Sequence, residues 1–290
     1  MSEAHRQAPR RHSRLRIRFF KVCETIARVC GGRALYRALN LRPGRFAVRH
    51  ERLAVGADSP LVGLRLVQLS DIHAGPFLAA GDLVHVVAAA NALEPDLCLF
   101  TGDLISRTPD EGLLVLDDLA ALTARLGTFA VFGNHDYRYR EERRLAAAFA
   151  ERGIRFLLNE SVRPLGEESP LVLLGVEDLE EAKSLDLTAA RAGLRPGDLE
   201  VVLSHNPAGS VALLSPATRL VLSGHTHGNQ IDLPYLRTLG PHHPGERVEL
   251  RPASETERAA TLIVNRGLGV VGVPLRIFAR PELVLVELVP

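Results

Sequence analysis

The sequence predicts a layered α/β fold, on two observations. Short apolar runs that stop at a glycine or a polar residue alternate along the chain with longer stretches of helical periodicity. Five of these runs lead within three residues to an aspartate, asparagine or histidine, and open α/β sheets bind ligands at the carboxyl ends of their strands. With 290 residues, of which 46% are hydrophobic, the chain is long enough to bury a continuous core.

The first half of the body shows the alternation most clearly. We expect strands at residues 46–55, 64–69, 96–101 and 127–132, because these runs are rich in aliphatic, β-branched and aromatic side chains. Periodic apolar positions predict helices at about 79–93, 111–125 and 141–152. The second half continues with expected strands at 154–158, 162–165, 171–176, 199–203 and 220–222. Three more, at 262–265, 277–278 and 283–288, are expected to complete a second sheet.

Residues 1–45 form a separate basic arm, and residues 46–290 form the predicted domain. Residues 1–50 hold thirteen lysines and arginines against two acidic residues, whereas the remainder holds twenty-two against thirty-two. One face of a predicted helix that ends near Gly31 is apolar and carries Leu15, Phe19, Val22, Ile26 and Val29. Such a helix could lie on an anionic membrane surface or pack on its own domain, and both interpretations stay open. Nucleic acid is disfavoured as a partner, because the arm contains no recognisable binding motif.

The composition bears on the compartment. Because the chain contains no run of eighteen apolar residues, we expect no membrane-spanning helix. Its three cysteines do not form a disulfide framework, which favours a reducing compartment. We therefore expect a cytoplasmic protein, with peripheral attachment to the inner membrane as an open possibility.

The polar residues that follow the strands are suited to metal chemistry. They are Asp71, His73, Asp103, Asn134, His135, Asp136, His205, His225 and His227. Any one of them alone would be read as an ordinary turn or cap residue. Together, oxygen and imidazole donors without thiolates suit Mn, Fe or Zn, and the supply exceeds what one ion needs. Two ions that share a carboxylate can hold a hydroxide and clamp the phosphate oxygens while phosphorus is attacked, and a neighbouring imidazole can protonate the departing oxygen.

The chain resembles the calcineurin-like metallophosphoesterase family in five motifs that occur in the same order. They are Asp71-Ile72-His73, Gly102-Asp103, Gly133-Asn134-His135-Asp136, His205 and Gly224-His225-Thr226-His227. The resemblance covers roughly residues 64 to 290 and implies a four-layer α/β/β/α sandwich with a dimetal site at the strand ends. It implies one ion bound by Asp71, His73 and His227, a second bound by Asn134, His205 and His225, and Asp103 bridging both. It also implies that His135 contacts phosphate or acts as a general acid and that Asp136 orients His135.

Two further stretches resemble the bacterial branch of this family that is often associated with the membrane. Gly228 is followed by Gln230 and Pro234, and residues 265–269 are followed by Pro274 and Arg276. Asn229 stands where a second glycine is more usual, which removes no ligand but stiffens the loop.

The apolar stretches at 76–78, 233–236 and 270–275 follow motif loops, so they either pack within their loops or face an acyl chain or a membrane. They motivate the hypothesis of a phosphodiesterase or pyrophosphatase that acts at the membrane surface on a lipid-linked substrate, such as the UDP-diacylglucosamine used by some relatives in lipid A synthesis. A soluble phosphodiesterase for cyclic nucleotides or nucleic-acid ends is the alternative enzyme, and a catalytically silent metal-binding scaffold is the non-enzymatic alternative. His242 and His243 could contact substrate, whereas a solvated loop is the favoured interpretation of Glu177 and Asp178.

Overall fold

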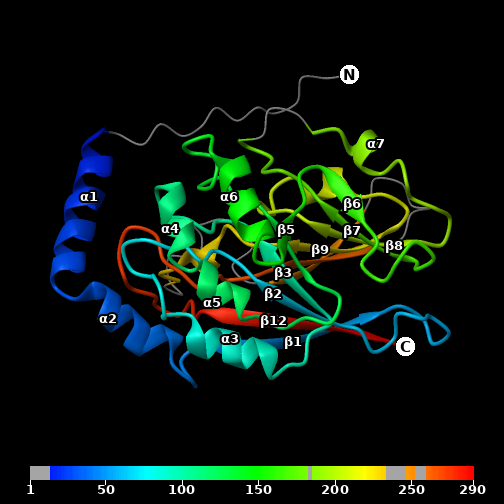
Figure 1. Cartoon of the computed structure of the whole chain (residues 1–290), viewed down its shortest axis with the longest axis horizontal. Coiled ribbons are helices and arrows are strands. Elements are labelled where there is room, and N and C mark those ends of the chain that lie inside the picture. The colour runs from blue at the N-terminus through cyan, green and yellow to red at the C-terminus, as the bar shows by residue number, and fades with distance from the viewer. Residues whose placement is uncertain (1–13, 182–184, 233–245, 252–258) are drawn as a thin grey trace.

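Two six-stranded β-sheets form the centre of the protein. The computed structural model describes residues 14–181, 185–232, 246–251 and 259–290, which are coloured along the chain in Figure 1. The first sheet has the strand order β1-β12-β2-β3-β4-β5 and the second has the order β10-β11-β9-β8-β7-β6. The first contains β1 (Ala47–Ala54), β2 (Arg65–Leu69), β3 (Leu97–Thr101), β4 (Thr128–Val131), β5 (Ile154–Phe156) and β12 (Glu282–Val289). The second contains β6 (Glu160–Val162), β7 (Leu171–Gly175), β8 (Leu199–Leu203), β9 (Thr218–Ser223), β10 (Arg247–Leu250) and β11 (Ala260–Val264).

The alternation of side chains along each strand divides the core into layers. In β2, Leu66 joins the cluster that fills the space between the two sheets, whereas Val67 and Leu69 join the cluster beneath the helices. Both faces of this strand are buried, as expected for a parallel sheet covered on both sides. A third cluster lies on the outer face of the second sheet, so the predicted four-layer arrangement is confirmed.

The helices lie on the outer faces of the sheets. The first sheet is covered by side chains from α3 (Val84–Asn91), α5 (Leu116–Ala120) and α6 (Glu142–Ala150), with α4 (Pro109–Leu113) packed against α6. The second sheet carries two short elements, α7 (Leu187–Ala190) and the 3-10 turn η2 (Ser210–Leu213).

The N-terminal segment is attached to the loop that follows β11. It consists of α1 (Arg14–Val29), α2 (Gly32–Tyr36) and a π-helical turn, η1 (Arg37–Leu41), and α1 lies at one edge of the molecule (Figure 1). The fully buried Tyr36 donates its hydroxyl to the carbonyl of Leu268 at 2.6 Å, and Leu41 is buried in the same core cluster. The division of the chain at residues 45/46 remains a prediction. None of the described helices is both long enough and apolar enough to cross a bilayer.

Only one side of α1 rests on the body. Ala27 packs against the core cluster beneath the helices, and Glu24 forms an ion pair with Arg107. In contrast, Val22, Ile26 and Val29 are 57%, 58% and 78% exposed. The helix is therefore docked and still leaves a row of apolar side chains uncovered over its described part.

Some of the sequence-based expectations were wrong. The run 283–288 is not in the second sheet: it forms β12, which lies between β1 and β2 in the first sheet. Apart from Glu287 the run is apolar, and most of β12 is buried on both faces, as is typical of a strand inside a covered sheet. The run 277–278 makes one isolated bridge, between Ile277 and Ile231. The helix expected at 111–125 is two short helices, α4 and α5, and the strand expected at 162–165 lies earlier, as β6. The elements β10 and α7 were not predicted.

Candidate metal centre

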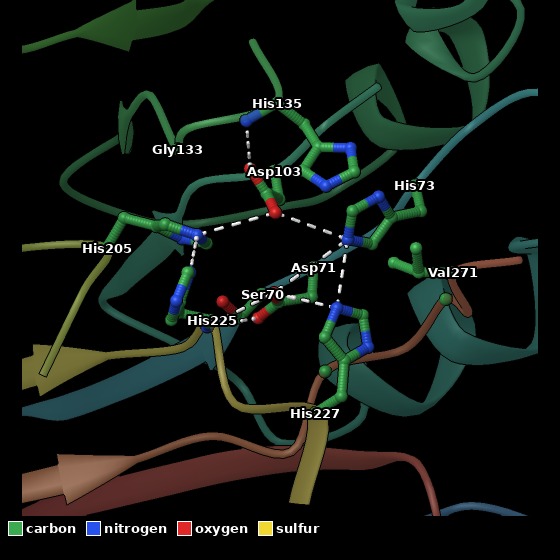
Figure 2. A network of polar contacts seen from close by, with 12 residues as sticks. Ser70, Asp71, His73, Asp103, Gly133, His135, His205, His225, His227 and Val271 are labelled. Atoms are coloured by element: carbon green, nitrogen blue, oxygen red, sulfur yellow. Dashed lines mark hydrogen bonds and ion pairs between the residues drawn. The ribbon is translucent and has the colours of Figure 1, made fainter. Parts of the chain in front are cut away.

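Strands from both sheets end at one place. The loops after β2, β3 and β4 of the first sheet carry Asp71 and His73, Asp103, and the triplet 134–136. The loops after β8 and β9 of the second sheet carry His205, His225 and His227. Figure 2 shows most of these side chains pointing toward a common centre. The structure thus brings together, at the predicted edge, side chains that are as far as 156 positions apart in the sequence.

One group of donors fits a divalent cation. Asp71, His73, Asp103 and His227 are all buried, and one ligand atom from each lies within 4.8 Å of the others. His73 Nε2 lies 3.3 Å from Asp103 Oδ2, and His227 Nε2 lies 3.2 Å from Asp71 Oδ1. Two carboxylates and two imidazoles without a thiolate are the donor set of a borderline or hard divalent ion, so the residues present fit such a metal.

A second group of donors lies on the other side of Asp103. His225 Nδ1 is 3.1 Å from Asn134 Oδ1 and 3.2 Å from His205 Nε2. The carbonyl of Thr101 accepts a hydrogen bond from His205 Nδ1 at 2.7 Å, and this contact turns Nε2 toward the site. Asp103 Oδ2 is 3.4 Å from His205 Nε2 and 3.3 Å from His73 Nε2, so this oxygen lies between the two groups. The arrangement could hold two ions that share the Asp103 carboxylate.

The backbone of these loops is held in a conformation that residues with side chains rarely adopt. Asp71, His73, Asp103, His225 and His227 all have positive φ, between 47° and 69°. Each such residue costs on the order of 1–3 kcal/mol, and the cost persists only where surrounding contacts determine the conformation. Backbone hydrogen bonds from Asp71 to the carbonyl of Gly102 and from His73 to the carbonyl of Asp103 supply part of that support.

Glycines allow the loops to approach closely. A Cβ on Gly224 would lie 1.9 Å from Ser70 Oγ and 2.3 Å from Asp71 Oδ2, and a Cβ on Gly133 would lie 2.3 Å from Asp103 Oδ1. Asn229, at the position where the sequence departs from the usual glycine, has a φ of 64°. Asparagine tolerates this left-handed conformation better than most residues, so the loop keeps a glycine-like path.

The charges of the site shift the pKa values of its groups in opposite directions. Burial alone would raise the pKa of Asp103, but the positive charge of His205 and hydrogen bonds from His205 and His73 outweigh it and hold this pKa well below its usual range. Burial opposes the charging of His205, but the charge and hydrogen bond of Asp103 and the charge of Asp71 raise its pKa to about 10. Asp103 is therefore ionised, as a bridging ligand must be, and His205 must release a proton to bind a cation.

His135 lies at the edge of this cluster. Its backbone N–H donates to Asp103 Oδ1 at 2.8 Å, and its ring meets that of His73 edge to face with centroids 4.6 Å apart. Its Nδ1 lies 3.0 Å from the carbonyl of Ser106, which can only accept, so Nδ1 carries the proton. Burial, reinforced by the charges of His73 and Arg138 and opposed by that of Asp103, lowers the pKa of His135 to about 3.

The expected orienting contact from Asp136 to His135 is absent. The Asp136 carboxylate instead accepts the backbone N–H groups of Gly133, Leu104 and Ile105, at 2.8, 3.3 and 3.1 Å. Asp136 therefore fastens the loop after β4 to the loop after β3, and the Ser106 carbonyl orients the His135 ring. The sequence carried no signal for Ser106, because a backbone carbonyl acts through its position and not through its residue type.

Other residues near the site were assigned wrongly or missed. Asp178, expected in a solvated loop, is fully buried, and its Oδ1 accepts from the backbone of Glu180 and Glu181. Its companion Glu177 accepts from the hydroxyl of Tyr137 at 2.9 Å. Arg138, which follows the triplet by two residues and contacts His135, was not singled out.

The apolar stretches around the site differ in exposure. Phe77 and Leu78 are buried in the core, which is ordinary loop packing. Val271, Leu275 and Phe278 are 43%, 44% and 73% exposed. The stretch 233–236 and the pair His242 and His243 lie outside the described residues. A separate pocket of about 500 Å³ reaches the second donor group, and its lining includes Glu180, Asn206, Val211, His225 and Leu262.

Comparison with known proteins identifies the family. The model of the calcineurin-like phosphoesterase family matches residues 64–229, more than half of the chain. The chain therefore belongs to the calcineurin-like metallophosphoesterases, and its Asp and His cluster fits a divalent metal site.

Three relatives illustrate the range of the family. A "Transmembrane protein with metallophosphoesterase domain" of Danio rerio is 33% identical over 77% of this chain, which spans about half (52%) of that protein. The "Phosphodiesterase YaeI" of Escherichia coli is 28% identical over 85% of this chain and 90% of its own length. The "UDP-2,3-diacylglucosamine pyrophosphatase LpxG" of Chlamydia muridarum is 30% identical over 78% of this chain and 84% of its own length.

Proposed function

We propose that the protein is a dimetal phosphodiesterase or pyrophosphatase that acts at a membrane surface on a lipid-linked substrate such as UDP-diacylglucosamine. The observation that carries this proposal is that Val271, Leu275 and Phe278 are exposed in a segment that is hydrogen-bonded to the loop of His227. The name of the Chlamydia muridarum relative supports the same substrate class, and that of the Escherichia coli relative supports diester hydrolysis.

The exposed apolar segment is tied directly to the metal donors. Gln230, three residues after His227, donates to the carbonyl of Val271 at 3.1 Å and accepts its backbone N–H at 2.8 Å. Arg276 donates to the carbonyls of Gly269 and His227, at 2.6 and 3.3 Å. Because these bonds fix the segment against the His227 loop, its apolar side chains stay beside the site. An acyl chain or the hydrophobic part of a membrane would cover them, whereas a wholly polar substrate would leave them in water.

The roles of the side chains follow from their contacts. Asp71, His73, Asp103 and His227 would hold one ion, and Asn134, His205 and His225 would hold a second with Asp103 shared. Two divalent ions, Mn, Fe or Zn, supply an activated water and neutralise the charge of the phosphate when they are bound. His135 presents Nε2, the nitrogen that is free of the Ser106 carbonyl, and would take up a proton there before passing it to the leaving oxygen. Asp136 keeps the two loops that carry Asp103 and His135 in register.

Substrate choice tests the enzymatic proposal. Metal-stripped protein would be given Mn, Fe, Zn or Mg separately and assayed with UDP-diacylglucosamine in mixed micelles, with bis-p-nitrophenyl phosphate and with a cyclic nucleotide. We expect metal-dependent hydrolysis of the first two and a higher kcat/KM for the lipid-linked substrate. A preference for the cyclic nucleotide would support the soluble alternative, and no turnover of any substrate with any ion would support the scaffold.

Variants of the apolar segment test where the lipid lies. Phe278→Ser and Leu275→Ser should raise KM for the micellar substrate and leave bis-p-nitrophenyl phosphate hydrolysis unchanged. Val62→Ser is the matched control, because Val62 is 38% exposed and lies in the turn before β2, at the opposite end of that strand from Asp71. An equal effect of all three variants would argue against an acyl-chain contact at 275–278.

The exposed side of α1 motivates the membrane part of the proposal. Val22, Ile26 and Val29 leave an apolar row on a helix whose sequence is rich in arginine, and Arg28 is exposed within it. Apolar burial combined with attraction to anionic headgroups is how such helices bind a membrane interface. We propose that this face contacts anionic lipid.

Sedimentation with vesicles tests this contact. The triple variant Val22→Ser, Ile26→Ser and Val29→Ser should lose binding to vesicles that contain phosphatidylglycerol, and wild-type protein should bind them more tightly than phosphatidylcholine vesicles. The triple variant is sharper than deletion of residues 1–45, because the deletion also removes the buried Tyr36 and Leu41. Equal binding by wild type and the triple variant would contradict the proposal.

A further inference from the structure

Arg138 holds a position that neither the family motifs nor the metal donors explain. Its Nη2 lies 2.8 Å from His135 Nε2, and its Nη1 donates to the carbonyl of Ser106 at 3.0 Å. Arg138 is an exposed residue, so its guanidinium reaches the site from the solvent side. Arg138 therefore combines an exposed position with a direct contact to His135.

The contact between Arg138 and His135 leaves binding capacity unused. A guanidinium carries five N–H donors, and in the described part of the chain only one imidazole nitrogen and one carbonyl accept from it. Among the described residues, no carboxylate lies within ion-pair distance of Arg138, whereas Arg140, two residues later, pairs with Glu181 at 3.7 Å. A guanidinium with unused donors beside a phosphohydrolase site is suited to an anionic group of the substrate, because its planar fork matches phosphate oxygens.

The order of His73, His135 and Arg138 indicates which phosphate of the substrate Arg138 would bind. The His135 ring lies between His73, whose ring it meets at 4.6 Å, and Arg138, which its Nε2 faces. A scissile phosphate bound at the donor cluster would place its leaving oxygen at His135 Nε2. In a diphosphate the leaving oxygen is itself bonded to the second phosphorus, so the second phosphate would lie at the next group outward, which is Arg138.

We propose that Arg138 binds the second phosphate of a diphosphate ester and makes the site selective for diphosphates over simple phosphodiesters. The proposal deepens the proposed function and rests on it, since it assumes that a phosphate is hydrolysed at the donor cluster. On binding, Arg138 exchanges its Nη2 contact with His135 for phosphate oxygens, and His135 Nε2 becomes free to face the leaving oxygen. No covalent bond changes in this step.

The test compares a diphosphate ester with a simple diester. The probe is UDP-N-acetylglucosamine, a water-soluble diphosphate diester, whose binding to metal-loaded protein is measured by calorimetry. Arg138→Gln should weaken this binding by about 10- to 100-fold, as expected when a hydrogen bond to a charged group is lost. Arg138→Lys should recover part of it, because lysine keeps the charge without the fork. If the probe is hydrolysed, the same ratio is expected in kcat/KM.

Matched measurements separate this proposal from the proposed function. Arg140→Gln, in the same loop, should bind the probe as the wild type does. The Arg138→Gln variant should lose much less kcat/KM toward bis-p-nitrophenyl phosphate than affinity for the probe. Two outcomes would overturn the role of Arg138 and leave the proposed function standing. In one, the wild type hydrolyses bis-p-nitrophenyl phosphate but does not bind the probe; in the other, the Arg138 and Arg140 variants lose equal affinity for the probe. Absence of any phosphodiesterase activity would overturn the proposed function, and binding of the probe could still be measured.

Discussion

The Nε2 atoms of His73 and His227 lie 2.9 Å apart, although the two residues are 154 positions apart in the sequence. Each also faces a carboxylate, Asp103 for His73 at 3.3 Å and Asp71 for His227 at 3.2 Å. A single proton between two imidazole nitrogens would satisfy one donor and one acceptor and leave both carboxylates to other partners. A cation at this point satisfies all four groups, so the geometry is that of a ligand set.

The first prediction concerns how many ions each variant binds. Wild-type protein should retain close to two divalent ions per chain. His227→Ala should retain about one, because only the first donor group is damaged, and Asp103→Asn should retain less than one, because its carboxylate oxygen faces both groups. Metal content after gel filtration, measured by inductively coupled plasma mass spectrometry, gives the stoichiometry.

A histidine away from the site controls for this measurement. His85→Ala, on an exposed position of α3, should bind as many ions as the wild type. If Asp103→Asn and His227→Ala lost the same number of ions, Asp103 would not be the shared ligand.

The second prediction separates chemistry from metal binding. His135→Ala should reduce kcat by about 10²- to 10⁴-fold, the usual contribution of a positioned acid or base. Its metal content should stay at the wild-type level, because the contact of His135 with Asp103 is made by its backbone N–H, which alanine keeps. Tyr139→Phe, at an exposed position in the same loop, serves as the control. A variant with full activity would exclude His135 from proton transfer.

The sequence predicted the metal donors well, because their role depends on residue type and on their position directly after a strand. A strand that stops at a glycine or a polar residue specifies which side chain stands at the sheet edge, so the donors from Asp71 to His227 could be placed before the fold was known. The partner of a strand is not specified in this way. The composition of the run that forms β12 would suit a central or an edge strand of either sheet. Only tertiary packing places it between β1 and β2.

Contacts made through the backbone were beyond prediction from the sequence. The ring of His135 is oriented by the carbonyl of Ser106, and Asp136 binds three backbone N–H groups. Neither contact depends on a residue type at the other end, so no pattern in the chain could reveal it. Arg138 was missed for a related reason, since an arginine in a polar loop acquires a role only from the group it meets.

The third prediction tests the close approach of the β9 loop to Asp71. Gly224→Ala would place a Cβ 1.9 Å from Ser70 Oγ and 2.3 Å from Asp71 Oδ2, and neither contact can be tolerated without movement. Because Asp71 accepts the backbone N–H of His225 at about 3 Å, its displacement should also disturb that loop. We expect weaker binding of one ion, seen as a lower retained metal content. Gly193→Ala, where a Cβ would meet nothing within 4 Å, should retain the wild-type content; a loss in both variants would assign the effect to glycine replacement in general.

The fourth prediction concerns the pH dependence of stability at the start of β8, the strand that delivers His205. Arg163 binds Asp198 through two hydrogen bonds, of 2.9 and 2.7 Å, and the two side chains are only 8% and 5% exposed. These hydrogen bonds from Arg163 outweigh burial and, with the backbone N–H of Arg195, lower the pKa of Asp198 below its usual value. A carboxyl group with a lowered pKa in the folded state stabilises the fold above the pKa of the unfolded chain. That stabilisation is lost as the pH falls through the folded-state pKa.

Asp198→Asn should therefore lower the free energy of unfolding by about 1–3 kcal/mol at pH 7, the range for a hydrogen bond to a charged group. The difference between variant and wild type should shrink below about pH 4, where the unfolded wild-type carboxyl is itself protonated. Urea denaturation at pH 7 and at the lowest pH where the wild type stays folded measures both values. Glu167→Gln removes a pair in which the carboxylate is 83% exposed and should cost less than about 0.5 kcal/mol at either pH. A deficit in Asp198→Asn that stays constant with pH would show that lost packing, and not the charge of Asp198, stabilises the start of β8.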